Sequence, residues 1–393
     1  MKGQNLPKPR KKAITFFFLV LLALNPAFVF SGANKELTVR RRLTMAHFGT
    51  VSQIVVYDDF SRRTAVQNWD NCWEEIKALL TDLETKLSSE IPEGDIGRFN
   101  ALKAGESIVI SNETAEVFLL AKELYEISGG AFNPAVYLLA DLWGFTPRFM
   151  LPVQSRPIMP YDRQSSPSSS LPDEQYIRAF TELADFNNCI IETTNDGRYM
   201  LTKAGNDITV EGISYSLKLD FGGIGKGYAA DKVGSLLKRY GYTYGLVNIG
   251  SSSFQLLGYY GEHNKTMDEH SGLWPVNIRS PFDRSNTYLT AYGKNEAIST
   301  SGTYDNYYVI DTRRYSHIID TKTGYPANED IVSATIIGGN AAWGDAVTTA
   351  LCIMPLEEAR RFMEEQLQNY QVILILGDGS LLSNTSRYQL IPP

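Results

Sequence analysis

The sequence LDFGGIGKGYAAD, residues 219–231, places a glycine-rich turn between the end of a strand and the start of a helix. Such a turn lets the backbone approach a phosphate, and helix-start N–H groups and a lysine add positive potential. A P-loop is excluded, because it needs glycine where Asp220 stands and Ser or Thr where Gly227 stands. A dinucleotide fingerprint is also excluded, because the glycines are spaced G-x-G-x-G rather than G-x-G-x-x-G. By itself the stretch predicts either a phosphate-binding turn or a tight structural turn.

Strand-like and helical segments alternate on both sides of this turn. Runs of β-branched or apolar residues predict strands at residues 51–57, 189–193, 208–210, 246–249 and 332–337. Apolar residues three and four apart predict helices at residues 73–87, 114–127, 229–239 and 342–354. This order predicts an α/β or α+β body of mixed sheets flanked by helices, beginning at residue 34. A Pro/Ser-rich stretch without periodicity, residues 151–174, predicts a surface insertion or linker within it.

Composition restricts the class of protein. The 393 residues are 43% hydrophobic, enough for a large core, and the net charge of −7 argues against nucleic-acid binding, which favours clustered Lys and Arg. Cys72, Cys189 and Cys352 are too few and too scattered for a disulfide framework, so they are interpreted as buried or incidental thiols.

The N-terminus has the pattern of a targeting segment. Basic residues between Lys2 and Lys12 precede an apolar run, residues 13–30, and the small residues 31–33 suit a signal peptidase. Residues 1–33 are therefore predicted to be a secretion signal, with an uncleaved inner-membrane anchor as the alternative. Both interpretations predict an exported, periplasmic protein.

A carboxylate and a hydroxyl lie one helical turn apart in the last predicted helix. Asp345 and Thr349 share one face there and offer the hard oxygen ligands that Mg²⁺ prefers. The alternative is an aspartate near a helix start, favoured by the helix dipole.

Three further segments carry groups suited to a ligand. His317 and Asp320 lie at a predicted strand end, where ligand loops commonly begin, although a lone histidine is often structural. The small polar cluster at residues 298–308, with Ser301 and Gly302, suits either phosphate oxygens or a hairpin turn. Residues 129–145 combine small and aromatic side chains, which suits either a flat ring slot or, for Trp143 above all, core packing.

Taken in order, these segments resemble the ApbE-type FAD:protein FMN transferase family. HFGT at 47–50 is similar to the family's Met-Gly-Thr, DIGRFN at 95–100 to Glu-Ile-Ser-Arg-Leu-Asn, and GAFNP at 130–134 to Gly-Xaa-Phe-Asp-Pro. The glycine-rich turn is similar to Gly-Gly-Ile-Ala-Lys-Gly-Tyr-Ala. The segments at 247–250, 299–302 and 317–320 follow in the family's order, and Asp345 with Thr349 completes it.

The resemblance implies an α/β fold with a flavin cleft between two subdomains. It also implies Mg²⁺-dependent cleavage of FAD to AMP and transfer of FMN, through a phosphoester, to Thr or Ser of an exported partner with a Ser/Thr-Gly-Ala-Thr-like target. By position, Asp345, Thr349 and the Gly223 carbonyl would bind the metal, and His317 would activate the acceptor hydroxyl. The residues expected to bind FAD are Phe48, Glu90, Ala131, Phe132, Asn133, Asp220, Lys226, Ser301, Gly302 and Ile319.

Three residues depart from the family pattern. Phe48 replaces methionine, Asn133 replaces aspartate, and Glu90 stands where an aromatic ring beside the flavin is expected. Losing a stacking ring would loosen the isoalloxazine and admit water. A Mg²⁺-dependent FAD pyrophosphatase therefore remains an alternative, as do a non-enzymatic FAD-binding protein and a structural exported domain.

Overall fold

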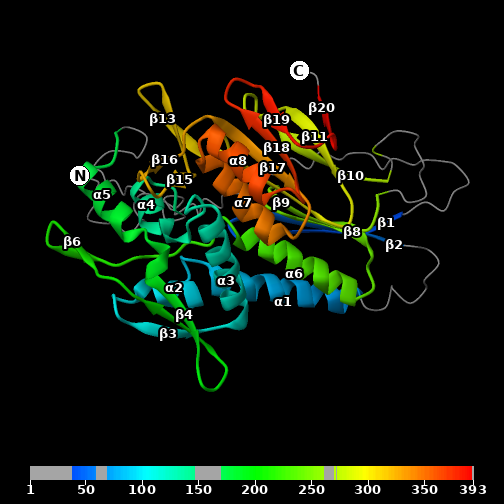
Figure 1. Ribbon diagram of the computed structural model, residues 1–393. Coiled ribbons are helices and arrows are strands. Elements are labelled where there is room, and N and C mark those ends of the chain that lie inside the picture. The colour runs from blue at the N-terminus through cyan, green and yellow to red at the C-terminus, as the bar shows by residue number, and fades with distance from the viewer. Residues whose placement is uncertain (1–37, 59–68, 147–169, 261–269, 271, 392–393) are drawn as a thin grey trace, which may run out of the picture. The chain divides into compact units, whose positions relative to one another are not determined.

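An eight-stranded antiparallel sheet organises the protein (Figure 1). The computed structural model describes residues 38–58, 69–146, 170–260, 270 and 272–391, all within one unit, residues 35–393. The strands, in spatial order, are β1 (Thr38–His47), β2 (Thr50–Asp58), β8 (Tyr244–Ile249), β9 (Ser253–Leu257), β12 (Ala297–Gly302), β17 (Ile331–Ile337), β18 (Gln371–Leu376) and β19 (Leu381–Ser383).

Helices cover one face of this sheet (Figure 1). Helix α6 (Gly225–Arg239) packs on β8 and β9, and α7 (Ala341–Ile353) packs on β12 and β17. The other helices are α1 (Trp69–Leu87), α2 (Asp95–Ala101), α3 (Asn112–Ile127), α4 (Tyr137–Leu142), α5 (Glu174–Leu183) and α8 (Leu356–Gln366), with short 3-10 turns at Pro134–Val136 and Phe186–Asn188.

A small sheet covers the opposite face. It consists of β10 (Trp274–Arg279), β11 (Thr287–Gly293) and β20 (Tyr388–Leu390), in that order. Successive residues of a strand point to opposite faces, so Ile336 joins the core on the helix side and Ile337 the core under the small sheet. All seven residues of β17 are buried, which fits a strand with only small polar residues, Ser333 and Thr335, among its apolar ones.

The remaining strands form one three-stranded sheet and three hairpins. A three-stranded sheet has the order β3 (Ser107–Ile110), β5 (Tyr199–Lys203) and β4 (Cys189–Thr193). The hairpins are β6 (Ile208–Val210) with β7 (Ile213–Tyr215), β13 (Tyr307–Ile310) with β14 (Arg313–Ser316), and β15 (Ile319–Asp320) with β16 (Tyr325–Pro326).

The predicted fold class and elements are confirmed. All five predicted strands and all four predicted helices are present, although α6 begins at Gly225, four residues earlier than expected, and so includes Lys226. The three cysteines are buried and free, and Trp143 lies in the core. Among the described residues no helix is both long and apolar enough to span a membrane.

Two sequence predictions fall largely on residues that are not described. The predicted signal or anchor segment, residues 1–33, lies outside the described residues. So do residues 151–169 of the predicted insertion, whereas residues 170–173 carry neither helix nor strand and α5 begins at Glu174.

Candidate active site

One large cleft collects most of the residues singled out from the sequence. Its volume is about 880 Å³, and turns, strand ends and helix starts from nearly the whole described chain line it. The lining includes the predicted residues Phe48, Phe132, Asn133, Asp220, Gly223, Lys226, Ser301, Gly302, His317, Ile319, Asp345 and Thr349. Glu90 and Ala131 do not line it.

The starts of α6 and α7 form the floor of the cleft and cap each other. Asp231 of α6 accepts hydrogen bonds from the N–H groups of Ala341 and Ala342, at 2.8 and 2.9 Å. Asp345 of α7 in turn accepts one from Gly227 N–H at 3.1 Å. Each carboxylate thus satisfies N–H groups that a helix start leaves without intrahelical partners.

Burial and a neighbouring charge raise the pKa of Asp231. Burial raises the pKa of Asp231 to about 6, and the nearby Asp345 carboxylate acts in the same direction, against the two backbone hydrogen bonds. Asp345 is the fifth residue of α7, so its carboxylate serves the neighbouring helix rather than the first turn of its own.

The predicted metal ligands lie together. The Thr349 hydroxyl donates to the Asp345 carbonyl at 3.0 Å, and it lies 3.5 Å from the point where a Cβ on Gly223 would stand. The Asp345 side chain is only 3% exposed but lines the cleft. A carboxylate, a hydroxyl and a backbone carbonyl are oxygen donors, which fit Mg²⁺.

This donor set is small. Within the described residues, no group of three or more His, Cys, Asp or Glu side chains could hold a metal ion. Mg²⁺ commonly binds through one or two carboxylates together with substrate phosphates and water, so a site of this kind fits a phosphate-bearing substrate.

Lys226 brings a positive charge to the same point. Its ammonium group donates to the Gly222 carbonyl at 2.5 Å and lies 3.8 Å from Asp345 Oδ2. Asp220, at the start of the turn, accepts the Gly222 N–H at 2.7 Å, and burial raises the pKa of its carboxyl group. The N–H groups of Gly222, Ile224, Gly225 and Gly227 already donate within the protein, so the donor that the turn offers to an anion is the Lys226 ammonium group.

The tight turn between β1 and β2 forms one wall of the cleft. Phe48 and Gly49 both have positive φ, 54° and 65°, and the paired residues His47 and Thr50 flank them. Two-residue hairpins of this type favour Asn-Gly, so a phenylalanine here is strained. Glu84 holds the turn, because it accepts Phe48 N–H at 2.7 Å and contacts the His47 ring at 2.9 Å.

His317 lies exposed at the cleft, with its tautomer set by a neighbour. Its Nδ1 lies 3.2 Å from the Asn306 carbonyl, which can only accept, so Nδ1 carries the proton and Nε2 keeps a free lone pair. Partial loss of hydration lowers the pKa of His317, the Lys226 charge adds to this, and Asp305 opposes it. These features suit a neutral general base.

A charged cluster beside His317 was not predicted from the sequence. Arg279 at the end of β10 donates to Asp305 at 3.2 Å, and Arg284 contacts the same carboxylate at 3.8 Å. All three residues line the cleft. No local pattern reveals this cluster, because the β10–β11 hairpin and the turn before β13 meet only in the folded chain.

Asn133 and Glu90, both predicted to contact FAD, form hydrogen bonds within the protein. The Asn133 amide donates to the Ala184 carbonyl at 2.7 Å and the Thr321 hydroxyl at 2.8 Å. Glu90 accepts the Tyr137 hydroxyl at 2.9 Å, and burial raises the pKa of its carboxyl group.

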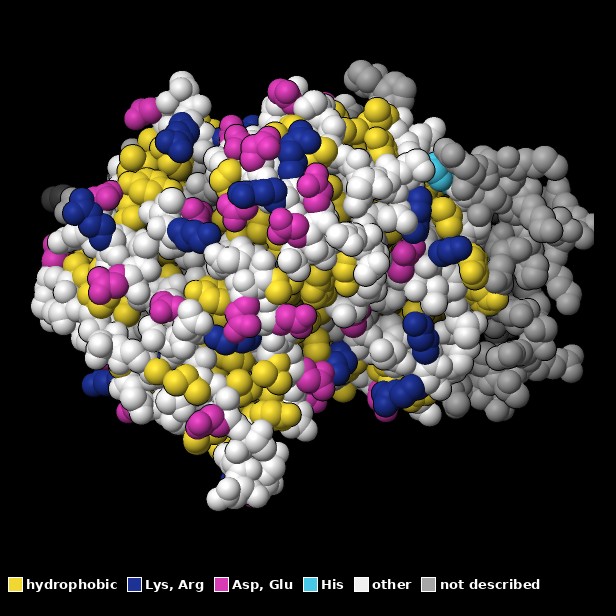
Figure 2. Space-filling model, viewed as in Figure 1, with side chains coloured by type: hydrophobic (Ala, Val, Ile, Leu, Met, Phe, Trp, Pro, Cys, Tyr) yellow, Lys and Arg dark blue, Asp and Glu magenta, His cyan; other side chains and the backbone are white. Residues whose placement is uncertain are grey.

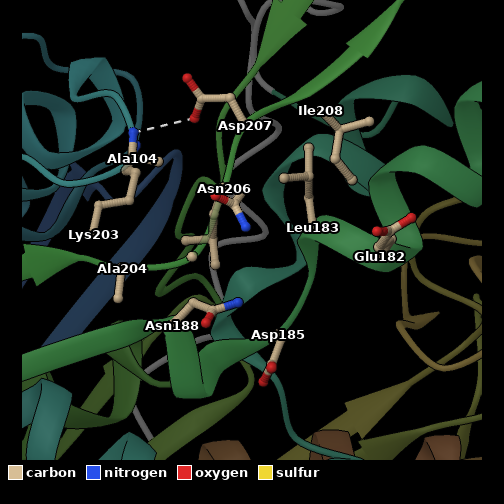
Figure 3. A pocket seen from close by; sticks show the side chains of 12 residues that line it. Ala104, Glu182, Leu183, Asp185, Asn188, Lys203, Ala204, Asn206, Asp207 and Ile208 are labelled. Atoms are coloured by element: carbon tan, nitrogen blue, oxygen red, sulfur yellow. Dashed lines mark hydrogen bonds between the residues drawn. The ribbon is translucent and has the colours of Figure 1, made fainter.

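A second cavity, of about 290 Å³, lies between α5 and the segment after β5 (Figure 3). Lys203 and Asp207 are among its lining residues, and none of the predicted site residues is. The Asp207 carboxylate takes part in structural hydrogen bonds, because its Oδ1 accepts the Ala104 N–H at 3.1 Å and the Ser216 hydroxyl at 2.6 Å.

The surface in Figure 2 carries basic and acidic side chains interspersed, without an extended patch of one sign. The described part of this face therefore offers no broad positive patch to an anionic ligand.

Comparisons with known proteins identify relatives of the chain. The ApbE family model matches residues 48–374. The FAD:protein FMN transferase of Klebsiella pneumoniae is 28% identical over 87% of this chain and 85% of its own, and that of Treponema pallidum is 27% identical over 81% and 79%.

Solved structures share the fold. The ApbE protein of Thermotoga maritima has a TM-score of 0.68 at 23% identity, covering 87% of this chain and 96% of its own. The flavin transferase ApbE of Vibrio cholerae has a TM-score of 0.68 at 24% identity, covering 88% and 97%. The matched segment includes every cleft residue from Phe48 to Thr349, and the chain therefore belongs to the ApbE family.

Proposed function

We propose that the protein is a Mg²⁺-dependent FAD:protein FMN transferase. The observation that carries the proposal is the meeting, in one cleft, of Asp345, Thr349 and Lys226 with His317. Curated relatives that match most of the chain bear the same activity as their name.

The pyrophosphate of FAD would lie over the starts of α6 and α7. Asp345, Thr349 and the Gly223 carbonyl would hold Mg²⁺, which neutralises charge on phosphate oxygens when the pyrophosphate breaks. Lys226 supplies a second positive charge 3.8 Å from Asp345, and the glycine turn lets the phosphates approach the backbone.

His317 would act on the acceptor. Its Nε2 takes the proton of a Thr or Ser hydroxyl, the freed oxygen attacks the FMN phosphorus, and the bond to the AMP phosphate breaks. FMN is then joined to the acceptor through a phosphoester and AMP leaves. The exposed position of His317 supports this role, because a protein acceptor must reach the base from outside.

Residues 1–33 would export the chain, as a cleaved signal or as an inner-membrane anchor, so that the acceptor is a periplasmic protein. Fractionation of cells that produce the full chain tests this: recovery in the cytoplasm would contradict it.

One incubation separates the candidate activities. The purified protein is mixed with FAD, Mg²⁺ and an acceptor peptide containing Ser-Gly-Ala-Thr, and the products are separated by chromatography. AMP together with flavin fixed on the peptide is expected. AMP with free FMN alone would indicate a pyrophosphatase, and intact FAD would indicate a binding protein.

A further inference from the structure

Strand β10 presents a free edge to the cleft. Among the described residues it pairs with β11 alone, at the end of the small sheet. Five consecutive residues, 275–279, line the cleft. Because side chains of a strand alternate between its faces, a lining of consecutive residues means that the backbone edge itself borders the cavity.

The register shows which backbone groups point outward. Pro275, which lies opposite Tyr292, has no N–H, and the Tyr292 N–H donates to Arg387 on the far side of β11. This pair is therefore not hydrogen-bonded, and in an antiparallel ladder the same holds two residues along, at Asn277 and Thr290. The Asn277 N–H and C=O consequently point away from β11.

A side-chain contact agrees with this assignment. The Thr290 hydroxyl lies 2.9 Å from Asn277 Oδ1, as expected for a non-hydrogen-bonded pair, in which side chains approach more closely. The edge ends at Arg279, where the register shifts by one residue.

The edge leads to the reacting group. Arg279 contacts Asp305 at 3.2 Å, and the carbonyl of the next residue, Asn306, holds the His317 ring. Two arginines, 279 and 284, contact the Asp305 carboxylate at the end of this edge.

We propose that the acceptor protein binds as an added β-strand along β10. An extended acceptor segment would pair with the outward N–H and C=O of Asn277 and the C=O of Pro275, which places its Thr or Ser hydroxyl near His317. An acidic residue in the segment would meet Arg279 and Arg284. This inference rests on the proposed transferase function and adds how the acceptor is recognised.

A backbone substitution tests the inference. Asn277→Pro removes the outward N–H; Pro275, two residues earlier and with the same orientation, shows that this edge strand accommodates a proline. Asn277→Ala is the matched control, because it removes the side chain and keeps the N–H. The full chain is assayed with FAD, Mg²⁺ and a synthetic peptide, Asp-Ser-Gly-Ala-Thr with three residues added at each end.

The expected result is an increase of about tenfold in the KM of the peptide for Asn277→Pro, in the range of one lost hydrogen bond and a steric clash. The KM of FAD should change by less than about twofold, and Asn277→Ala should raise the KM of the peptide by less than about threefold. In the wild type, N-methylation of alternate peptide residues should weaken transfer with a period of two.

Three results would overturn the inference: equal losses in the two variants, an equal increase in the KM of FAD, or N-methylation effects without alternation. A wild-type protein that cleaves FAD but never labels the peptide would contradict the proposed transferase function itself, and the acceptor site with it.

Discussion

Asp345 combines two duties in one carboxylate. Its Oδ2 accepts the Gly227 N–H, which fixes the start of α6, while the side chain also borders the cleft beside Thr349. The sequence alone offered a choice between a metal ligand and a structural helix-start residue. The structure gives it a structural contact to the neighbouring helix without removing it from the cleft.

Substitution separates these duties. Asp345→Asn keeps an oxygen for the Gly227 N–H but loses the charge, so FAD turnover should fall by at least about 100-fold, roughly 2.7 kcal/mol in the barrier. The midpoint of urea unfolding should change little, whereas Asp345→Ala should also lose about 1 kcal/mol of stability with the cap. Turnover followed as AMP release, alongside unfolding curves, checks both. Normal turnover in Asp345→Asn would remove the metal assignment.

The protonation of His317 predicts the pH dependence of transfer. Because loss of hydration lowers its pKa below the ordinary 6.5, the neutral base persists below that pH, and the acid limb of kcat/KM should lie under pH 6.5. Asp305 raises this pKa, so Asp305→Asn should move the limb further toward acid. A pH profile of peptide labelling measures both, and a limb that does not move would show that His317 is not the titrating base.

Lys203 predicts a stability effect away from the cleft. Its side chain is 1% exposed, donates to the Leu102 carbonyl at 2.7 Å, and burial lowers its pKa to about 8. The folded pKa lies below the unfolded value of about 10.4, so stability should increase as pH rises from 8 to 10. Lys203→Met removes the titrating group, so the increase in stability between pH 8 and 10 should disappear in this variant. Urea unfolding of both proteins across this pH range is the measurement, and an equal increase in the variant would contradict the prediction.

At the scale of elements, the contact between α6 and α7 depends on glycine. A Cβ on Gly227 would stand 2.1 Å from the Ala341 carbonyl oxygen, closer than any real contact. That proximity brings the two helix starts together, which in turn allows Asp231 and Asp345 to cap across the interface. The glycine-rich stretch is thus both a structural turn and the edge of the cleft.

The prediction for this interface is a loss of fold stability. Gly227→Ala forces the helix starts apart and should cost about 3 kcal/mol, at the upper end for overpacking. Gly225→Ala is the matched control, because its Cβ would meet the Phe48 ring at 3.8 Å and the Leu87 side chain at 3.9 Å, which are ordinary contacts. Urea unfolding of both variants decides the matter: equal stabilities would mean that the contact is not tight.

At the scale of the whole molecule, the sequence predicted what is local and buried. Strands such as β17 follow from runs of β-branched and apolar residues, and helices such as α1 follow from apolar periodicity. The order of the motifs predicted that distant segments share one cleft, and they do. Strand β10 was not predicted: its buried and exposed residues alternate as in a strand, but the segment is short and contains Pro275, which counts against a strand. The Arg279–Asp305 contact was missed for a different reason, since it joins residues 26 apart through tertiary packing.

The residues that line the cleft extend from Phe48, near one end of the described chain, to Thr349, near the other. A ligand that fills it therefore binds only the folded molecule and should raise the free energy of unfolding by about 2.7 kcal/mol at one hundred times its Kd. If Mg²⁺ bridges Asp345 and the pyrophosphate, FAD should raise Tm more with Mg²⁺ than with EDTA, and Asp345→Asn should abolish the difference. Calorimetry of the wild type and of Asp345→Asn, each with FAD and either Mg²⁺ or EDTA, measures the coupling between metal and flavin binding. An FAD-induced shift of equal size with and without Mg²⁺ would mean that the flavin is held without the metal.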